Sequence, residues 1–346
     1  MKSRSSVIWN VAVLVTLLGP VFSSAQEAEY QWVNPLPAEA HPRLSHGTFR
    51  SASMGVDVGF VIYLPRGYED QENAQRRYPV VYHLHGGLRG TEIRSIGMTT
   101  YFDQAIESGL VPPRIYVFVN GGPHSHYDYG GFLAETAFVK ELIPHIDGNY
   151  RTIAARSGRS IEGFSAGGRG TARIAFAYPE LFCAATPMAG GHQHEKLVSE
   201  DRAMESNSAI PIPRDYNSWD RASQYAARES ASELDILVVV GSEDMNYESN
   251  MAWMDHLASL GIPFESRIVP GVGHNMRGVF SQIGDEIIRF PEGCFQQAVV
   301  AQQPDDRVRA SGRRSRSRWA WSTRPAECWY CVADETLLRR WGRGDD

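Results

Sequence analysis

Residues 161–168 read Ile161-Glu162-Gly163-Phe164-Ser165-Ala166-Gly167-Gly168. The serine has a glycine two residues before it and another two residues after it, with β-forming residues upstream and an alanine-rich stretch downstream. This pattern predicts a sharp turn from a strand into a helix with an exposed serine hydroxyl, because a Cβ at either glycine would collide with a neighbouring element. A glycine-rich surface turn is the alternative. The helix predicted over 171–178, which Pro179 ends, favours the strand-to-helix turn.

The composition is that of a globular protein. The chain has 346 residues, of which 42% are hydrophobic and 21% charged, enough for one large core or two small ones. Its formal net charge is -6, so we expect no nucleic acid among the partners of the folded body.

The first 25 residues differ from the rest. Lys2 and Arg4 precede an apolar run over 7–18, and Ser23-Ser24-Ala25 fits a small-residue cleavage site. Residues 1–25 are therefore predicted to be a secretory signal peptide, which implies a secreted or periplasmic protein with no integral membrane span after cleavage. An uncleaved membrane anchor is the alternative.

Predicted strands and helices then alternate along the chain. Period-two alternation predicts an edge strand pair over 47–64, and runs of β-formers predict buried strands over 78–85, 114–119, 182–186, 234–240 and 264–269. Helices are predicted over 100–108, 132–150, 171–178 and 250–260. Such alternation predicts an α/β fold with a mostly parallel central sheet and helices on both faces.

The same pattern suggests the domain boundaries. Residues 26–45, rich in Pro and Ala, are predicted to be an extended lead-in to a main domain over 46–295. Within it, the polar stretch 192–215 is predicted to be a lid or an insertion. Residues 296–346 form an arginine-rich tail that lacks lysine from Asp305 onward, and we expect a disordered or out-of-frame extension. Binding to anionic surfaces is the alternative for this tail.

Three residues that can act together each follow a predicted strand: Ser165, Asp244 and His274. A serine hydroxyl is a weak nucleophile near neutral pH, so a base must take its proton, and an acid must orient that base. The order Ser, Asp, His along the chain is that of the α/β-hydrolases. We therefore predict a catalytic triad, with Glu243 and Glu248 as alternatives for the acid.

Backbone N–H groups are predicted to bind the substrate oxygen that becomes negative. One is the N–H of Ala166, at the start of the predicted helix. A second is expected from the turn after the strand 78–85, where glycines let the backbone come close, and the donor is Gly87 or Leu88.

Histidine pairs raise the question of a metal site. The pairs are His83 with His85, His124 with His126, and His192 with His194. None completes a recognisable zinc signature, and serine hydrolysis needs no metal, so we predict neither metal nor cofactor. The residues His124, His126, Tyr127 and Trp219 are instead predicted to line the acyl or alcohol pocket.

Four cysteines complete the inventory. Cys183 lies in an apolar run and is predicted to be a small core residue, whereas Cys328 and Cys331 form one isolated pair without the partners of a zinc site. Any disulfide pairing, including that of Cys294, is left open.

Several stretches together point to a family. They are 62–68 (Ile-Tyr-Leu-Pro-Arg-Gly-Tyr), the His-Gly-Gly turn at His85, 141–146 (Glu-Leu-Ile-Pro-His-Ile) with 149–151, the turn at Ser165, 178–182 (Tyr-Pro-Glu-Leu-Phe), 241–244 and Gly273-His274. From about Phe49 to Phe290 the chain resembles the putative-esterase branch of the α/β-hydrolases, which holds feruloyl and acetyl-xylan esterases, S-formylglutathione hydrolases, iron-siderophore esterases and mycolyltransferases. It departs from the family at Ala166 and Arg169, where methionine and an aromatic residue are frequent.

The resemblance implies the nucleophile, acid and base already chosen, Ser165, Asp244 and His274. We expect an exported serine carboxylic-ester hydrolase that works through an acyl-enzyme on a small-molecule or polysaccharide ester. Because S-formylglutathione is cytosolic, feruloyl or acetyl esters of polysaccharides are the better expectation. The alternatives are an acyltransferase to a sugar alcohol and a non-catalytic glycan-binding protein on a hydrolase scaffold. The oligomeric state is left open.

Overall fold

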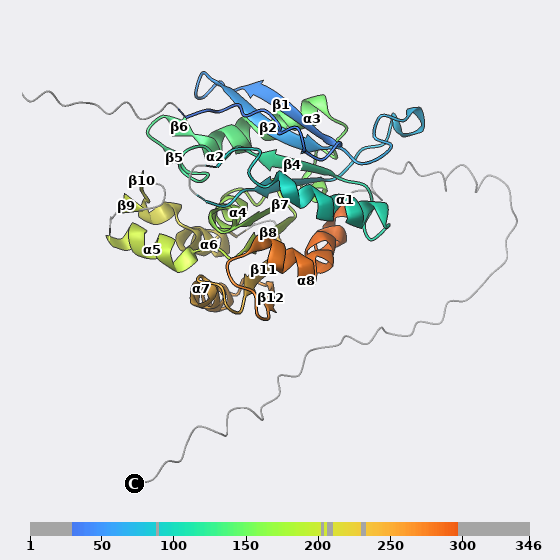
Figure 1. Ribbon diagram of the computed structural model, residues 1–346. Helices are drawn as coiled ribbons and strands as arrows, with labels where there is room; N and C mark the ends of the chain where they lie inside the picture. Colours follow the sequence, from blue (N-terminus) through green and yellow to red (C-terminus); the bar gives the residue numbers. More distant parts are fainter. Residues whose placement is uncertain (1–29, 88–89, 202–203, 206–209, 230–232, 297–346) are drawn as a thin grey trace, which may run out of the picture. The chain divides into compact units, whose positions relative to one another are not determined.

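An eight-stranded sheet lies at the centre of the computed structural model, which describes residues 30–87, 90–201, 204–205, 210–229 and 233–296 (Figure 1). The strands follow the order β1 (Leu44–Arg50), β2 (Asp57–Tyr63), β4 (Ile115–Val119), β3 (Val80–Leu84), β7 (Arg159–Phe164), β8 (Ala184–Met188), β11 (Asp235–Gly241) and β12 (Glu265–Val269). Strand β1 pairs antiparallel with β2 and β2 with β4, whereas all further neighbours are parallel.

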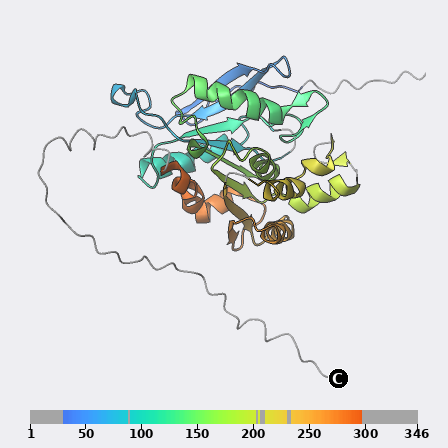
Figure 2. The same ribbon diagram turned by 180° about the vertical axis from the view of Figure 1, so that it is seen from behind.

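Helices cover both faces of this sheet (Figures 1 and 2). One face packs against α1 (Thr99–Glu107) and α8 (Met276–Arg289), and the other against α3 (Ile143–Asn149), α4 (Ala166–Ala177), α6 (Ser218–Ala226) and α7 (Tyr247–Ser259). Neighbouring residues of β3 point to opposite faces, so that Tyr82 joins the core beneath α4 while Val81 joins the core beneath α1. The predicted mostly parallel sheet with helices on both faces is confirmed.

Shorter elements fill the connections. They are the helices α2 (Ala134–Thr136) and α5 (His192–Asp201), the π-helical segment η3 (Ala137–Leu142), the 3-10 turns η1 (Gln71–Asn73), η2 (Ile96–Met98), η4 (Arg156–Gly158) and η5 (Arg214–Tyr216), and the two-residue strands β5 (Asp128–Tyr129), β6 (Phe132–Leu133), β9 (Met204–Glu205) and β10 (Ile210–Pro211). The helix predicted over 132–150 therefore begins at Ala134 and passes through a π-helical turn before α3.

Strand β8 lies two residues further along the chain than predicted. The strand-like residues of the sequence predict a strand over 182–186, which ends before Pro187, a residue without an N–H to donate. In the structure, Ala185 and Met188 pair with β11 while Thr186 and Pro187 have no partner there, so the ladder is interrupted where the N–H is missing and then resumes. The strand thus reaches Met188, beside the serine turn.

The stretch 192–215 is largely built into the fold. It forms α5 and the small β9–β10 pair, and His192 and Glu195 on α5 are fully buried. A lid movement of this stretch stays a prediction.

The predicted signal peptide and arginine-rich tail lie outside the described residues, apart from residue 296. The chain also divides into two units, 1–302 and 303–346, the second of which is wholly outside them.

Among the described residues, no helix combines the length and the apolar character needed to cross a membrane.

A disulfide joins Cys183 to Cys294 across 111 residues of sequence. Both sulfur-bearing residues are buried, Cys183 just before β8 and Cys294 after α8. Cys183 lies in the core, as predicted, and the disulfide supplies the pairing that the sequence left open, with a partner from the far end of the domain. The bond ties the last helix to the central sheet.

We expect loss of this disulfide to lower the free energy of unfolding by about 2–4 kcal/mol, because the bond restricts the unfolded chain over a long loop. Thermal unfolding with and without reductant measures the effect. The reductant should lower the melting temperature of the wild type and leave that of the double variant Cys183→Ala/Cys294→Ala unchanged. Equal melting temperatures for wild type and double variant would contradict a stabilising role.

Candidate active site

Ser165 lies in the turn between β7 and α4, and its backbone is in a strained left-handed conformation with φ +60° and ψ -118°. Its N–H donates to the carbonyl of Met188 at 2.8 Å. A Cβ on Gly163 would stand 2.6 Å from the carbonyl oxygen of Gly167, and one on Gly167 would collide with the carbonyl oxygen of Leu84. The predicted strand-to-helix turn is confirmed, and its glycines are required by close backbone approach.

His274 and Asp244 meet Ser165 at the carboxyl ends of the parallel strands. The Nε2 atom of His274, in the loop after β12, lies 2.8 Å from Ser165 Oγ. Its Nδ1 atom lies 2.9 and 3.0 Å from the two carboxylate oxygens of Asp244, in the loop after β11. The Asp244 side chain is fully buried, while that of His274 is 22% exposed. The carboxylate is further held by the N–H of Asn246 at 2.8 Å.

This arrangement fixes the proton positions that base catalysis needs. A carboxylate can only accept a hydrogen bond, so Nδ1 of His274 carries a proton and donates it toward Asp244. The lone pair of Nε2 then faces the hydroxyl of Ser165, from which it could remove the proton. Burial of Asp244 keeps water from competing for the imidazole.

The backbone groups predicted to bind an oxyanion lie beside this serine. Ala166 is the first residue of α4, and Gly87 follows β3 with φ +81°. A Cβ on Gly86 would stand 3.2 Å from the Cβ of Ser165, so this loop approaches the serine closely. Leu88, the other predicted donor, lies outside the described residues.

A cavity of about 280 Å³ opens beside Ser165. It is lined by Gly87, Ser165, Ala166, Arg169, Gly191, His194, Met245, Asn246 and His274. Sequence reasoning missed five of these residues. A usable signal existed, because Arg169 follows Ser165 by one helical turn, Met245 and Asn246 adjoin Asp244, and Gly191 and His194 follow a parallel strand, where ligands bind.

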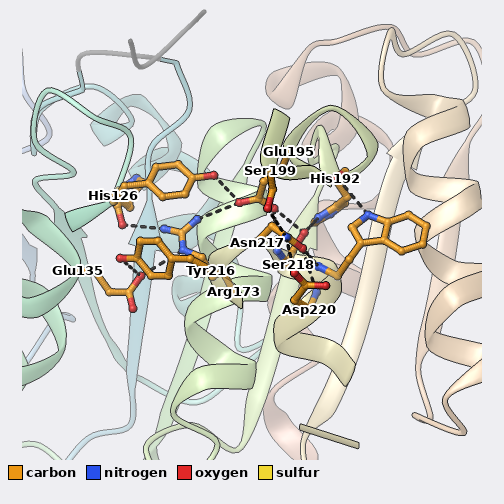
Figure 3. A network of polar contacts seen from close by, with 12 residues as sticks. His126, Glu135, Arg173, His192, Glu195, Ser199, Tyr216, Asn217, Ser218 and Asp220 are labelled. Carbon is orange, nitrogen blue, oxygen red and sulfur yellow. Dashed lines mark hydrogen bonds and ion pairs between the residues drawn. The ribbon is translucent and has the colours of Figure 1, made fainter. Parts of the chain in front are cut away.

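The four residues predicted to line the pocket lie elsewhere. His126, Tyr127 and Trp219 are at most 9% exposed, and His124 packs against the rings of Tyr129 and Phe132. None of the four is among the described residues that line the cavity. The prediction is corrected: the Tyr127 hydroxyl donates to Glu195, the Trp219 indole N–H donates to the carbonyl of His192, and the backbone carbonyl of His126 accepts from Arg173, so these three residues belong to a buried network of polar contacts (Figure 3).

Arg173 on α4 is the centre of that network. Its guanidinium pairs with Glu135 at 3.1 Å and with Glu195 at 3.3 Å, and it stacks 3.8 Å from the centroid of the Tyr127 ring. Burial opposes ionisation of Glu195, but the charges of Arg173 and Arg169 outweigh it and lower the pKa of that carboxyl. The network therefore holds a buried guanidinium between two carboxylates.

On its far side the network reaches α5 and α6. The hydroxyl of Ser218 donates to Glu195 at 2.6 Å and also contacts Nδ1 of His192 at 2.9 Å (Figure 3). The indole N–H of Trp219 donates to the carbonyl of His192 at 3.1 Å. These contacts attach α5, in the stretch after β8, to α6.

The histidine pairs have separate surroundings. His83 contacts Glu162 at 2.7 Å, whereas the rings of His85 and His126 lie tilted against each other with their centroids 4.5 Å apart. Within the described ranges, no group of three or more His, Cys, Asp or Glu side chains is arranged to hold a metal ion.

Comparison with known proteins gives the family. The family model described as Putative esterase matches residues 51–260, more than half of the chain, and the chain belongs to this family. An esterase of Mycobacterium tuberculosis is 28% identical over 273 residues, 69% of this chain and 57% of that protein. An endo-1,4-beta-xylanase/feruloyl esterase of Xylanibacter ruminicola is 32% identical over 173 residues, 48% of this chain and 24% of that protein. The chain spans less than two thirds of either relative.

A solved ferulic acid esterase shares the architecture. It superposes with a TM-score of 0.59 at 24% identity, over 73% of this chain and 98% of that chain. The protein has the α/β-hydrolase fold, as the sequence predicts.

Two glycine-to-alanine substitutions should distinguish the effect of close backbone packing on stability from the effect of helix propensity. Gly167→Ala should destabilise the fold by about 1–3 kcal/mol, because the new methyl group would collide with the Leu84 carbonyl. Gly148→Ala in α3 meets nothing within 4 Å and should stabilise by about 0.5–1 kcal/mol. Urea unfolding measures both, and a neutral or stabilising Gly167→Ala would contradict the packing.

Stability should fall as the pH is lowered from about 6.5. Burial lowers the pKa of His85 to about 4 and of His192 to about 3, and lowers that of His126 well below its ordinary value. Below pH 6.5 the unfolded chain binds protons that the folded protein does not. Each such histidine therefore lowers the free energy of unfolding by about 1.4 kcal/mol for every pH unit.

The matched variant is His192→Asn, which keeps a polar atom near Ser218. Between pH 5.5 and 4, its free energy of unfolding should fall less steeply with pH than that of the wild type. The slopes should differ by about 1.4 kcal/mol per pH unit, the effect of one proton. Identical slopes in pH-dependent urea unfolding would show that His192 is not held neutral.

Proposed function

We propose that this protein is a serine carboxylic-ester hydrolase that works through an acyl-enzyme. The observation that carries the proposal is the continuous contact from Ser165 Oγ to His274 Nε2 and from His274 Nδ1 to the buried Asp244. Membership of the Putative esterase family supports ester cleavage as the reaction. In the proposed roles, Ser165 is the nucleophile, His274 the base and Asp244 the orienting acid.

The reaction has two halves. Ser165 Oγ attacks the ester carbonyl carbon as its proton passes to His274 Nε2. The tetrahedral intermediate collapses, the bond to the alcohol oxygen breaks, and His274 gives its proton to the leaving alcohol. Water then enters, loses a proton to His274 and attacks the acyl-enzyme, which releases the acid and returns the proton to Ser165.

Backbone groups are proposed to stabilise the oxyanion in both halves. The N–H of Ala166 is one donor and that of Gly87 or Leu88 is the other. The loss of one such donor typically costs about 3–4 kcal/mol of transition-state stabilisation. The close approach of the loop at Gly86 to Ser165 supports this proposal.

Feruloyl or acetyl esters of polysaccharides are the proposed substrates. The relative of Xylanibacter ruminicola is named as a feruloyl esterase. Arg169, His194 and Asn246 line the cavity and offer nitrogen groups to the oxygen atoms of a phenolic acid or a sugar. A panel of methyl ferulate, acetylated xylan and short p-nitrophenyl esters would rank these substrates.

Export is proposed as well. The predicted signal peptide over 1–25 supports it, and so does the Cys183–Cys294 disulfide, because such bonds persist in oxidising compartments.

Ser165→Ala should lower kcat on p-nitrophenyl acetate by about 10³-fold or more, because the nucleophile is lost. A fluorophosphonate probe should label the wild type and fail to label this variant. The control is Ser281→Ala, which removes an exposed hydroxyl on α8 and should retain activity and labelling. Turnover by Ser165→Ala equal to that of the wild type would refute the proposed function.

A further inference from the structure

Three consecutive carbonyl groups of the loop after β3 accept hydrogen bonds from side chains. Nε2 of His126 lies 3.1 Å from the carbonyl oxygen of His85, Nδ1 of His85 lies 3.1 Å from that of Gly86, and the hydroxyl of Ser125 donates to that of Gly87 at 2.9 Å. This loop lies close to the candidate nucleophile, since a Cβ on Gly86 would stand 3.2 Å from the Cβ of Ser165.

A bond to a carbonyl also fixes the direction of the next N–H group. The peptide unit is planar, and in the trans form its C=O and N–H point in opposite directions. The described peptide bonds include no cis form. Holding the carbonyl of Gly86 therefore orients the N–H of Gly87, and holding the carbonyl of Gly87 orients the peptide unit that follows.

The contacts of the two histidines define their protons. Nε2 of His85 accepts the N–H of Gly121 at 3.0 Å, so Nδ1 carries the proton that is donated to Gly86. Nε2 of His126 faces a carbonyl, which can only accept, and so it carries a proton too. Both rings are buried and are set as donors toward the loop.

The loop that supplies Ser125 and His126 has a strained backbone. These two residues have φ +53° and +67°, a left-handed conformation that typically costs side-chain-bearing residues about 1–3 kcal/mol each. Arg173 opposes this cost, because its guanidinium donates to the carbonyl of His126 at 2.7 Å while Glu135 and Glu195 hold it from two sides (Figure 3). The strained residues are therefore the ones whose side chains donate to the loop 85–87.

We propose that Ser125 and His126 are positioning residues for catalysis, which hold the carbonyls of Gly87 and His85 and thereby fix the loop between them, with the N–H of Gly87, for the oxyanion. The proposal rests on the proposed ester hydrolysis. Neither residue touches the reacting atoms. Their effect is on the transition state, because the oxyanion exists there and not in the bound substrate.

The test compares three variants with a matched control. Ser125→Ala removes one hydroxyl, His126→Phe keeps a flat ring without a donor, and His126→Gln keeps an N–H at a similar reach. The control Ser199→Ala removes another buried hydroxyl, which accepts from Asn217 on the far side of the network. Kinetics on p-nitrophenyl acetate and thermal unfolding are measured for all four.

We expect Ser125→Ala and His126→Phe to lower kcat by about 10-fold or more with KM changed less than about twofold, since one oxyanion donor alone is worth about 10²–10³ in kcat. His126→Gln should recover most of the loss, and Ser199→Ala should retain the wild-type kcat. The inhibition constant of a trifluoromethyl ketone, whose adduct with a serine carries an oxyanion, should rise by the same factor as kcat/KM falls.

Two results would overturn the proposal: a wild-type kcat and ketone affinity in Ser125→Ala, or equal losses in Ser199→Ala. Should His126→Phe fail to fold, Ser125→Ala decides alone, because it removes a single oxygen atom. Failure of the proposed function is distinguishable, because Ser165→Ala would then cleave the ester as fast as the wild type does.

Discussion

The structure depends on how closely the backbones of β3, β7 and β8 approach at their carboxyl ends. The carbonyls of Leu84 and Met188 lie so near the start of α4 that only glycine fits at positions 167 and 168. This packing forces the chain to leave β7 in a sharp turn and places Ser165 above the sheet in a left-handed conformation. Every other part of the candidate site is arranged around that fixed hydroxyl.

Helix α4 links the turn at Ser165 to more distant parts of the molecule. Its first residues form the serine turn, and Arg173, two turns later, pairs with acids from α2 and α5. A fully buried guanidinium is costly unless it is paired, so the elements around it must keep their positions. Through His126 the same side chain reaches the loop after β3. Helix α4 therefore connects the candidate nucleophile with the loop 85–87, which is proposed to bind the oxyanion, and with the stretch after β8.

The sequence predicts those features that follow from strand ends and glycine spacing. Ser165, Asp244 and His274 could be found because each follows a run of β-formers, and parallel strands bring their carboxyl ends together. The four residues predicted to line the pocket were not chosen correctly this way, although Gly191 and His194, which do line it, also follow a strand. His126 and Tyr127 also follow a strand, but their direction is set by the left-handed backbone and by Arg173, which no local pattern reveals. Likewise, the partner of Cys183 comes from 111 residues away.

Part of the cavity wall consists of residues other than the groups proposed to act on the ester. Gly191 and His194 follow β8, and Met245, which is 80% exposed, and Asn246 follow β11. Apart from Asn246, whose N–H supports Asp244, none of them contacts the Ser–His–Asp set among the described hydrogen bonds. A mutant library restricted to residues 191, 194 and 245 would thus explore substrate range while leaving the hydrolytic apparatus intact.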